Sequence, residues 1–197
     1  MAIVSKVKKK LAKNVHFIIF GWLAKLKYQD YKRLHLAQRK PELPEVINMN
    51  ANDICNSKCT MCNIWKQKLD FEITPTQLEE VLRDPLFSKI KAVGITGGEP
   101  TLREDLPDLY EACCKSLPTL QGLSIITNAI KDKDVIARVT RVGEICDQYG
   151  VKFSMMVSLD GYGETHDRIR GVKGNFESAM RVINHFRKNT KIPVAIG

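Results

Sequence analysis

Hydrophobic and polar positions follow two different periods along residues 45–197. Short apolar runs predict five strands, at 45–54, 91–96, 122–127, 151–160 and 192–196. Amphipathic stretches of helical period lie between them and predict four helices, at 74–82, 104–117, 133–150 and 175–189. This alternation is typical of an α/β fold in which crossover helices connect the strands of a parallel sheet.

Helix-end signals support these boundaries. Thr74 is the expected N-cap of its helix, because Pro75 and Gln77 occupy the positions of a helix start and a capping box. Gly150 closes the helix at 133–150, and we expect Asn175 to cap the last helix. The strand runs are apolar throughout, which predicts burial on both faces of the sheet.

Residues 1–40 have a different character. They hold 11 of the 31 Lys and Arg residues but 1 of the 22 acidic residues, which leaves residues 41–197 with a net charge of −1. The sequence therefore predicts two domains, a basic amphipathic helical extension at 1–44 and a main domain at 45–197. A near-neutral main domain argues against a nucleic-acid groove.

The extension has two helical stretches, and two prolines separate it from the main domain. The apolar positions of helical period are Ile3, Val4, Val7, Leu11, Ile18, Ile19, Trp22, Leu23 and Leu26. A basic, amphipathic stretch fits an anionic membrane surface, and it also fits a helical cap that packs on the main domain. No secretory signal or bilayer-length apolar run is recognisable, so we expect a cytoplasmic protein, with peripheral membrane contact through residues 1–40 as one alternative.

Three cysteines, Cys55, Cys59 and Cys62, follow the first predicted strand with C-x3-C-x2-C spacing. In a reducing compartment such clustering indicates metal binding or catalysis rather than disulfides. Three thiolates on a [4Fe–4S] cluster would leave one iron open to a small chelating ligand. A zinc site completed by Cys113, Cys114 or a distant histidine is the alternative. Otherwise these two cysteines and Cys146 are expected to be small buried apolar residues.

Polar motifs follow the next three strands as well. They are the segment TGGEP at 96–100, the pair Thr127 and Asn128, and the pair Ser158 and Asp160. The carboxyl ends of parallel strands meet at one edge of a sheet, where α/β folds place their chemistry. We therefore expect these motifs to share one site with the cysteines.

Together, these motifs resemble those of the radical S-adenosylmethionine (SAM) superfamily. The cysteine spacing, GGEP and a His-Asp-x-x-Arg-Gly stretch at 166–171 are similar to the branch that modifies peptides or metabolites, the SPASM type. The resemblance covers residues 46–197 and implies a partial (β/α)6 TIM-like barrel. A sixth strand is missing, so we expect the chain to be truncated at its C-terminus. Ala129 departs from the glycine that the family often has.

The resemblance also implies the site residues. Cys55, Cys59 and Cys62 would bind the [4Fe–4S] cluster. The SAM-binding residues would be Met61, Gly97, Gly98, Glu99, Pro100, Thr127, Asn128, Ser158, Asp160 and Arg170. Among these, Glu99 would accept from the ammonium of SAM, Arg170 would pair with its carboxylate, and Ser158 and Asp160 would lie near the ribose. We interpret His166 as a residue of a solvated loop rather than as a catalytic base.

The implied activity is reductive cleavage of SAM to a 5′-deoxyadenosyl radical, which takes hydrogen from an unidentified substrate. That substrate would be a peptide or a lipid- or sugar-linked metabolite, and the electron would come from an external flavodoxin- or ferredoxin-like donor. Two alternatives stay open: a zinc-binding interaction module, and a catalytically inactive scaffold that binds a partner through its basic arm.

Overall fold

A computed structural model describes residues 18–36, 41–68 and 72–197 of the chain. Two compact units are present, one ending at Glu42 and the other spanning Leu43–Gly197. In the first unit a helix covers residues 18–31 and continues into a π-helical turn, η1, at Lys32–Leu36. Part of the predicted extension, including Ile3, lies outside the described residues.

The helix of the first unit carries large apolar side chains on its surface. Ile18 and Phe20 are each 70% exposed and Trp22 is 63% exposed. No helix in the described parts of the chain combines the length and the apolar character that crossing a membrane requires.

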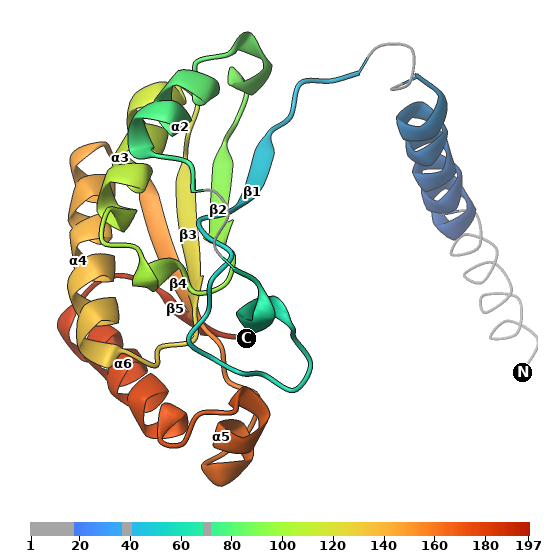
Figure 1. Cartoon of the computed structure of the whole chain (residues 1–197). Helices are drawn as coiled ribbons and strands as arrows, with labels where there is room; N and C mark the ends of the chain where they lie inside the picture. Colours follow the sequence, from blue (N-terminus) through green and yellow to red (C-terminus); the bar gives the residue numbers. More distant parts are fainter. Residues whose placement is uncertain (1–17, 37–40, 69–71) are drawn as a thin grey trace, which may run out of the picture. The chain divides into compact units, whose positions relative to one another are not determined.

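A five-stranded parallel sheet forms the centre of the second unit, with its strands in chain order (Figure 1). The strands are β1 (Val46–Asn50), β2 (Ala92–Thr96), β3 (Gly122–Thr127), β4 (Lys152–Val157) and β5 (Val194–Ile196). The sheet is not closed, since β1 and β5 pair on one side only. The predicted α/β class and partial barrel are confirmed.

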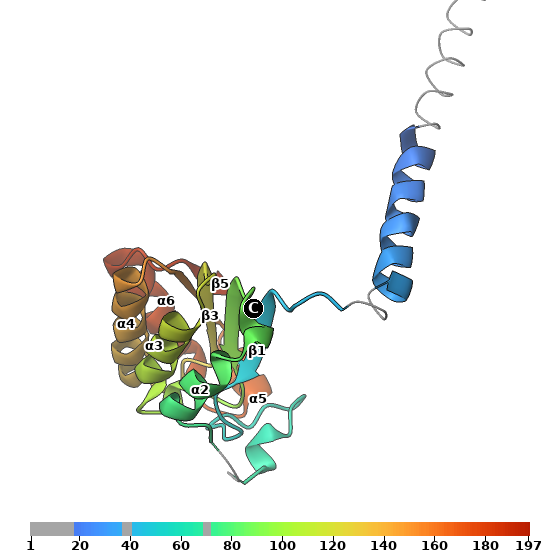
Figure 2. The ribbon, with the colours of Figure 1, turned by 90° about the horizontal axis from the view of Figure 1, so that it is seen from above.

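Helices cover one face of this sheet (Figures 1 and 2). The α-helices of this unit are α2 (Pro75–Leu82), α3 (Leu106–Ser116), α4 (Asp132–Gln148), α5 (Glu164–Arg170) and α6 (Asn175–Asn189). Three 3-10 turns accompany them, η2 (Ile64–Lys66), η3 (Pro85–Phe87) and η4 (Pro100–Leu102). α3, α4 and α6 pack side by side on the sheet, and the buried apolar core lies in this layer.

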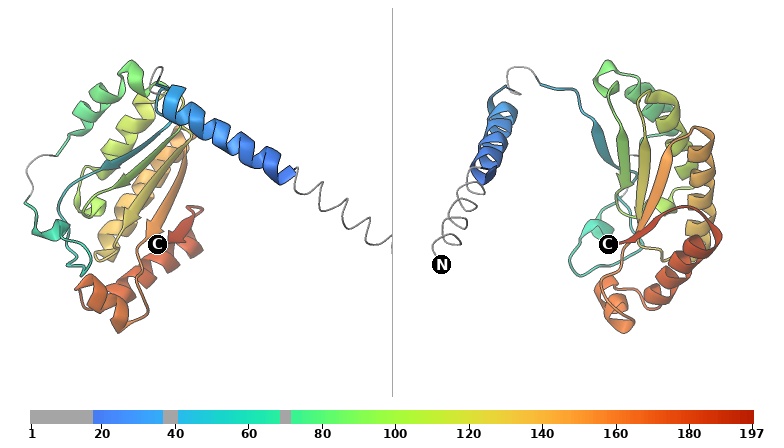
Figure 3. Two further views of the ribbon diagram at one scale, coloured as in Figure 1. Left: turned by 90° about the vertical axis from the view of Figure 1, so that its right-hand side faces the viewer. Right: turned by 180° about the vertical axis from the view of Figure 1, so that it is seen from behind.

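The opposite face of the sheet is open, and the views from the side and from behind show no helix of the second unit over it (Figure 3). Asn48, Gly94, Ser124 and Ser154 form one row across this face, in register on four adjacent strands. The prediction that both faces are buried is therefore wrong for this face. Five strands do not close around an interior, so these side chains lack the opposing strands that fill a complete barrel.

One predicted helix cap is confirmed and one is wrong. Thr74 and Gln77 form the expected capping box of α2. Asn175 is the first residue of α6 rather than its cap. Asp167 takes over that task, because its carboxylate accepts hydrogen bonds from the backbone N–H of Phe176 at 2.8 Å and of Gly174 at 2.5 Å. These two bonds lower the pKa of Asp167.

Candidate cluster and cofactor site

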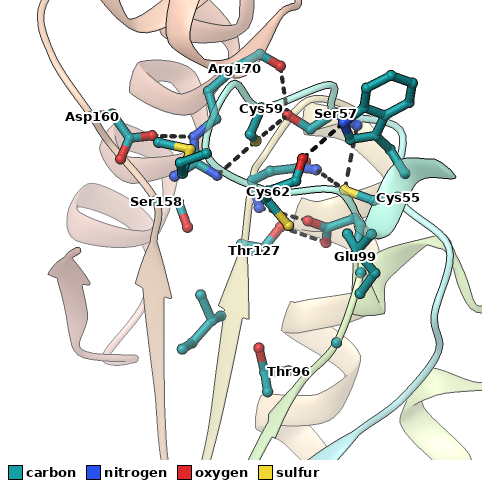
Figure 4. Close-up of a pocket in the computed structure, with 17 residues that line it drawn as sticks. Cys55, Ser57, Cys59, Cys62, Thr96, Glu99, Thr127, Ser158, Asp160 and Arg170 are labelled. Atoms are coloured by element: carbon teal, nitrogen blue, oxygen red, sulfur yellow. Dashed lines mark hydrogen bonds and ion pairs between the residues drawn. The ribbon is translucent and has the colours of Figure 1, made fainter. Parts of the chain in front are cut away.

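A cavity of about 270 Å³ lies at the carboxyl ends of the strands (Figure 4). The loop after β1 contributes the three cysteines, and β2, β3 and β4 contribute the polar motifs that follow them. The cavity is lined by Cys55, Ser57, Cys59, Met61, Cys62, Ile64, Trp65, Thr96, Gly97, Gly98, Glu99, Ile126, Thr127, Asn128, Ser158, Asp160 and Arg170. Every site residue predicted from the sequence is in this set except Pro100, which is buried in η4.

Hydrogen-bond donors approach two of the three sulfurs. Cys55 Sγ accepts from the backbone N–H of Ser57 at 3.4 Å and lies 3.6 Å from Asn128 Nδ2. Cys59 Sγ lies 3.1 Å from Ser57 Oγ and 3.7 Å from Arg170 Nη1. Such donors favour the thiolate form that binds metal, while burial raises the pKa of the Cys55 thiol.

The three cavity cysteines are free thiols that could hold a metal centre. A single zinc ion needs all its ligands within about 2.3 Å of one point, whereas each thiolate of an iron–sulfur cube binds a different iron. Three cysteines that line one cavity are a donor set that fits a [4Fe–4S] cluster, which cysteine thiolates hold.

The other cysteines lie elsewhere. Cys113 and Cys146 belong to the apolar core, and Cys114 packs against it. Neither Cys113 nor Cys114 lines the cavity, so neither is placed to complete a zinc site with the trio. Both Cys113 and Cys146 are fully buried, as expected from the sequence.

The two glycines of the TGGEP segment allow two parts of the chain to come together. The backbone N–H groups of Gly98 and Glu99 donate to Asn52 O at 2.9 Å and to Ile54 O at 2.8 Å. A Cβ on Gly98 would lie 1.8 Å from Ile54 O, and one on Gly97 would lie 2.4 Å from Asn52 O. Neither position has room for a side chain, because the backbone leading to Cys55 occupies that space.

Glu99 connects the ends of β2 and β3. Its side chain is 1% exposed and accepts from Thr127 Oγ1 at 2.8 Å and from the backbone N–H of Asn128 at 2.6 Å. Thr101 donates twice more, through its N–H at 3.1 Å and its hydroxyl at 2.5 Å. Burial raises the pKa of Glu99, and these four bonds oppose that shift. No cation pairs with this carboxylate among the described residues.

A buried arginine behind the site was not singled out from the sequence. Arg103 follows the TGGEP segment and donates to Ala51 O at 2.8 Å and to Ile73 O at 3.0 Å. Both oxygens of Asp105 also accept from it, at 2.9 and 2.7 Å. Arg103 thus ties the segment after β1 to the start of α2. The sequence feature that could have identified Arg103 is its place in the TLREDL stretch directly after GGEP.

Asp160 and Arg170 pair with each other at one side of the cavity (Figure 4). Arg170 Nε lies 2.5 Å from Asp160 Oδ2, in an orientation that makes an ion pair without an aligned hydrogen bond. The backbone oxygen of Arg170 accepts from Ser57 Oγ at 2.9 Å. Arg170 therefore holds the cysteine loop in place as well as lining the cavity.

The expectation that His166 lies in a solvated loop is wrong. The residue lies on α5 and is 0% exposed, because the segment is helical and packs against α6. The backbone N–H of Asp160 donates to His166 Nδ1 at 3.1 Å, so a neutral ring carries its hydrogen on Nε2. Nε2 then donates to Asn175 Oδ1 at 3.1 Å, and Asn175 Nδ2 donates to Asn128 O at 2.9 Å. This chain joins the ends of β3 and β4.

Four cavity residues were not singled out from the sequence: Ser57, Ile64, Trp65 and Ile126. A fifth, Thr96, belongs to the TGGEP motif but was given no binding role. Thr96 is the last residue of β2, and Ile126 is the next-to-last residue of β3. Because side chains two residues apart on a strand point to the same face, strand alternation could have placed both on the open face. Trp65 follows Cys62 by three residues and donates through Nε1 to Cys62 O at 2.9 Å.

An open parallel barrel with a three-cysteine loop at its carboxyl edge defines the class of this unit. Residues 49–196 match the family described as the Radical SAM superfamily. The chain belongs to this family. Its members are enzymes that use a [4Fe–4S] cluster and SAM, so the enzyme class and both predicted cofactors are confirmed.

Two relatives are named for tetrapyrrole synthesis. Fe-coproporphyrin III synthase of Methanosarcina barkeri is 32% identical over 161 residues, which are 80% of this chain and 38% of that protein. Pre-heme d1 synthase of Dinoroseobacter shibae is 31% identical over 166 residues, 83% of this chain and 38% of that protein. The chain thus spans about two fifths of the length of these curated relatives.

Two solved structures share the fold. Streptococcus suis SuiB bound to the precursor peptide SuiA matches with a TM-score of 0.59 and 21% identity, over 84% of this chain and 36% of that one. Native anSMEcpe with bound AdoMet and the Cp18Cys peptide matches with a TM-score of 0.56 and 24% identity. That match covers 78% of this chain and 42% of that one.

Proposed function

We propose that this chain is the SAM-cleaving core of a radical SAM enzyme. The observation that carries the proposal is the single cavity shared by three cysteines and the polar ends of three strands. A [4Fe–4S] cluster on Cys55, Cys59 and Cys62 would supply the electron that breaks the C5′–S bond of SAM and gives a 5′-deoxyadenosyl radical.

The chain's own residues would bind and orient SAM. The ammonium of SAM would provide the cation that the buried Glu99 carboxylate lacks in the described structure. Arg170 would exchange part of its pairing with Asp160 for the carboxylate of SAM, because a guanidinium has donors for both. Asp160 and Ser158 would then be left facing the ribose. Ile126 and Trp65 are large apolar side chains that line the cavity, and they would exclude water from the C5′–S bond of SAM.

The substrate would reach the radical along the open face of the sheet. This face ends at the cavity, and small or polar residues such as Gly94, Ser124 and Ser154 leave space above it. The names of the relatives point to tetrapyrroles or peptides, and a peptide or a lipid- or sugar-linked metabolite was expected from the sequence. We propose that the substrate is a tetrapyrrole, a peptide or a lipid- or sugar-linked metabolite. For each of these substrates, the radical would abstract a hydrogen atom.

Anaerobic reconstitution followed by iron, sulfide and zinc analysis tests the cluster. We expect about four irons and four sulfides per chain. Incubation with dithionite and SAM should then release 5′-deoxyadenosine, which chromatography detects. Cys59→Ser should lose both the cluster and the product, while the matched control Cys114→Ser should keep them. A colourless protein with one zinc, or a cluster-free folded protein, would contradict the proposal in favour of a zinc module or an inactive scaffold.

We also propose that the extension binds an anionic membrane surface on the cytoplasmic side. Its exposed apolar residues Ile18, Phe20 and Trp22 and the excess of basic residues over 1–40 support this. Sedimentation with vesicles containing phosphatidylserine should recover the protein, and vesicles of phosphatidylcholine alone should recover less. Phe20→Glu/Trp22→Glu should abolish recovery. Equal, weak recovery with both vesicles would instead favour a helical cap.

A further inference from the structure

Positive charge is concentrated around the cysteine loop. Residues 55–68 and 168–174 contain six Lys and Arg and no Asp or Glu. Since residues 41–197 have a net charge of −1, these 21 residues carry +6 while the others carry −7. Five of the six have exposed side chains, and we call them the basic rim: Lys58, Lys66, Lys68, Arg168 and Lys173.

The two segments form one surface. The backbone N–H groups of Lys58 and Thr60 donate to Arg170 O and Ile169 O, both at 2.9 Å. Gly171 has a φ of +67° and lies so near Lys58 that a Cβ there would be 2.6 Å from the lysine carbonyl oxygen. The end of α5 therefore packs directly on the cysteine loop, and the charges of both segments add.

The positive charges of the basic rim are not balanced by ion pairs within the described residues. None of its five residues forms an ion pair with a carboxylate among the described residues. Two neighbouring acids are engaged elsewhere, Asp160 with Arg170 and Asp167 with the start of α6, while Glu164 on α5 forms no ion pair with the described residues of the rim. Lys66 lies over the Trp65 ring at 5.1 Å. The cations are thus available to an external partner.

The basic rim includes part of the cysteine loop itself, because Lys58 lies between Cys55 and Cys59. Met61 stands between Cys59 and Cys62 and is 63% exposed, and Cys55 and Cys62 are only half-buried. A protein bound to the rim would therefore contact the loop that carries the three cysteines. Electron transfer weakens steeply with distance, and redox proteins meet through small, transient, charge-steered contacts.

We propose that the basic rim docks an acidic one-electron carrier protein of the flavodoxin or ferredoxin kind. The inference rests on the proposed function, because it assigns the partner that reduces the cluster on Cys55, Cys59 and Cys62. One electron leaves the carrier, which is oxidised, and enters the cluster, which is reduced, and no bond forms or breaks at the contact. The carrier's carboxylates lie against the rim.

A charge-reversal triple tests this surface without touching a cavity residue. Lys66→Glu/Arg168→Glu/Lys173→Glu reverses three rim charges. The matched control, Lys89→Glu/Lys133→Glu/Arg187→Glu, reverses three exposed charges away from the rim, and Arg187 lies in the last turn of α6 as Arg168 does in α5. Residues 1–40 are identical in both proteins, so their charge explains no difference between them.

Direct binding is the first measurement. The Kd of an acidic flavodoxin for the reconstituted protein is measured by flavin fluorescence at about 0.05 M and about 0.3 M salt. The rim triple should raise the Kd about tenfold or more at low salt and remove most of the salt dependence. The control triple should stay within about twofold of the wild type.

The second measurement compares two reductants in the release of 5′-deoxyadenosine. With reduced flavodoxin the rim triple should be slower by a similar factor, and with dithionite it should equal the wild type. Failure of all proteins with dithionite overturns the proposed function but leaves the binding result to decide on the rim. No flavodoxin binding by the wild type, or equal effects of the two triples, overturns the docking surface. Loss of vesicle or RNA binding in the rim triple, with flavodoxin binding unchanged, assigns the rim to that ligand instead.

Discussion

The helix-covered layer and the strand-end cavity are both buried but are held together differently. In the layer, fully buried residues such as Leu109, Ile125 and Val139 belong to one apolar cluster. At the cavity, Glu99 and His166 are equally buried, and each is held by directed hydrogen bonds. Apolar contacts tolerate small shifts, whereas a buried polar group that loses its partner is costly. The two regions should therefore respond differently to substitution.

Gly98→Ala should have the largest effect. The new methyl would meet Ile54 O at 1.8 Å, and because that atom is backbone, the segment leading to Cys55 has to move. We expect a loss of more than about 3 kcal/mol in the free energy of unfolding, together with loss of iron binding. Urea denaturation and iron analysis measure both.

Gly150→Ala is its control. Gly150 has a φ of +67°, and a methyl group placed on it would have no atom within 4 Å, so it tests backbone strain without a clash. It should cost about 1 kcal/mol and leave iron binding intact. Equal effects of the two substitutions would show that the close approach at Gly98 is unimportant.

Leu109→Ala removes apolar packing far from the cavity. The residue is 0% exposed on α3, and the expected loss is about 3 kcal/mol because a cavity remains. The fraction that stays folded should bind iron normally, since no hydrogen bond of the site is changed. A drop in iron per folded chain would show that the two regions are coupled.

His166→Ala breaks the polar chain between β3 and β4. It leaves the N–H of Asp160 and the side chain of Asn175 without their partner, at a cost of about 2 kcal/mol. SAM binding, followed by calorimetry, should weaken more than stability alone explains, because Asp160 lines the cavity. His185→Ala, at a partly exposed position on α6, should cost less than about 0.5 kcal/mol.

Ala129→Gly should have the smallest effect and the opposite sign. Ala129 has a φ of 56° and is 0% exposed, so the alanine is strained where the family often has glycine. Removing the methyl should stabilise the fold by about 0.5 kcal/mol, after the greater freedom of glycine in the unfolded chain is subtracted. Ala112→Gly on α3 should instead destabilise by about 1 kcal/mol. Destabilisation by Ala129→Gly would mean that the methyl's packing outweighs its strain.

Local pattern determined most of the architecture. The five strands and the helices α2, α3, α4 and α6 were predicted, because hydrophobic period and end signals act over a few neighbouring residues. The meeting of the motifs at one cavity also followed from the sequence, since the carboxyl ends of parallel strands share an edge. The helix α5 was missed, because its seven residues are too few for a clear period.

Only the tertiary structure decided which groups hold the site together. Asn is a residue type that often caps helices, yet the side chain of Asn175 bonds to His166 and to the backbone of Asn128. The carboxylate of Asp167 caps α6 instead. The partner of Gly98 is the backbone before Cys55, 44 positions away from it. The sequence by itself determined the elements and the chemical groups that they carry. Their pairing depends on distances between segments remote in the chain, and local periodicity contains no information about those distances.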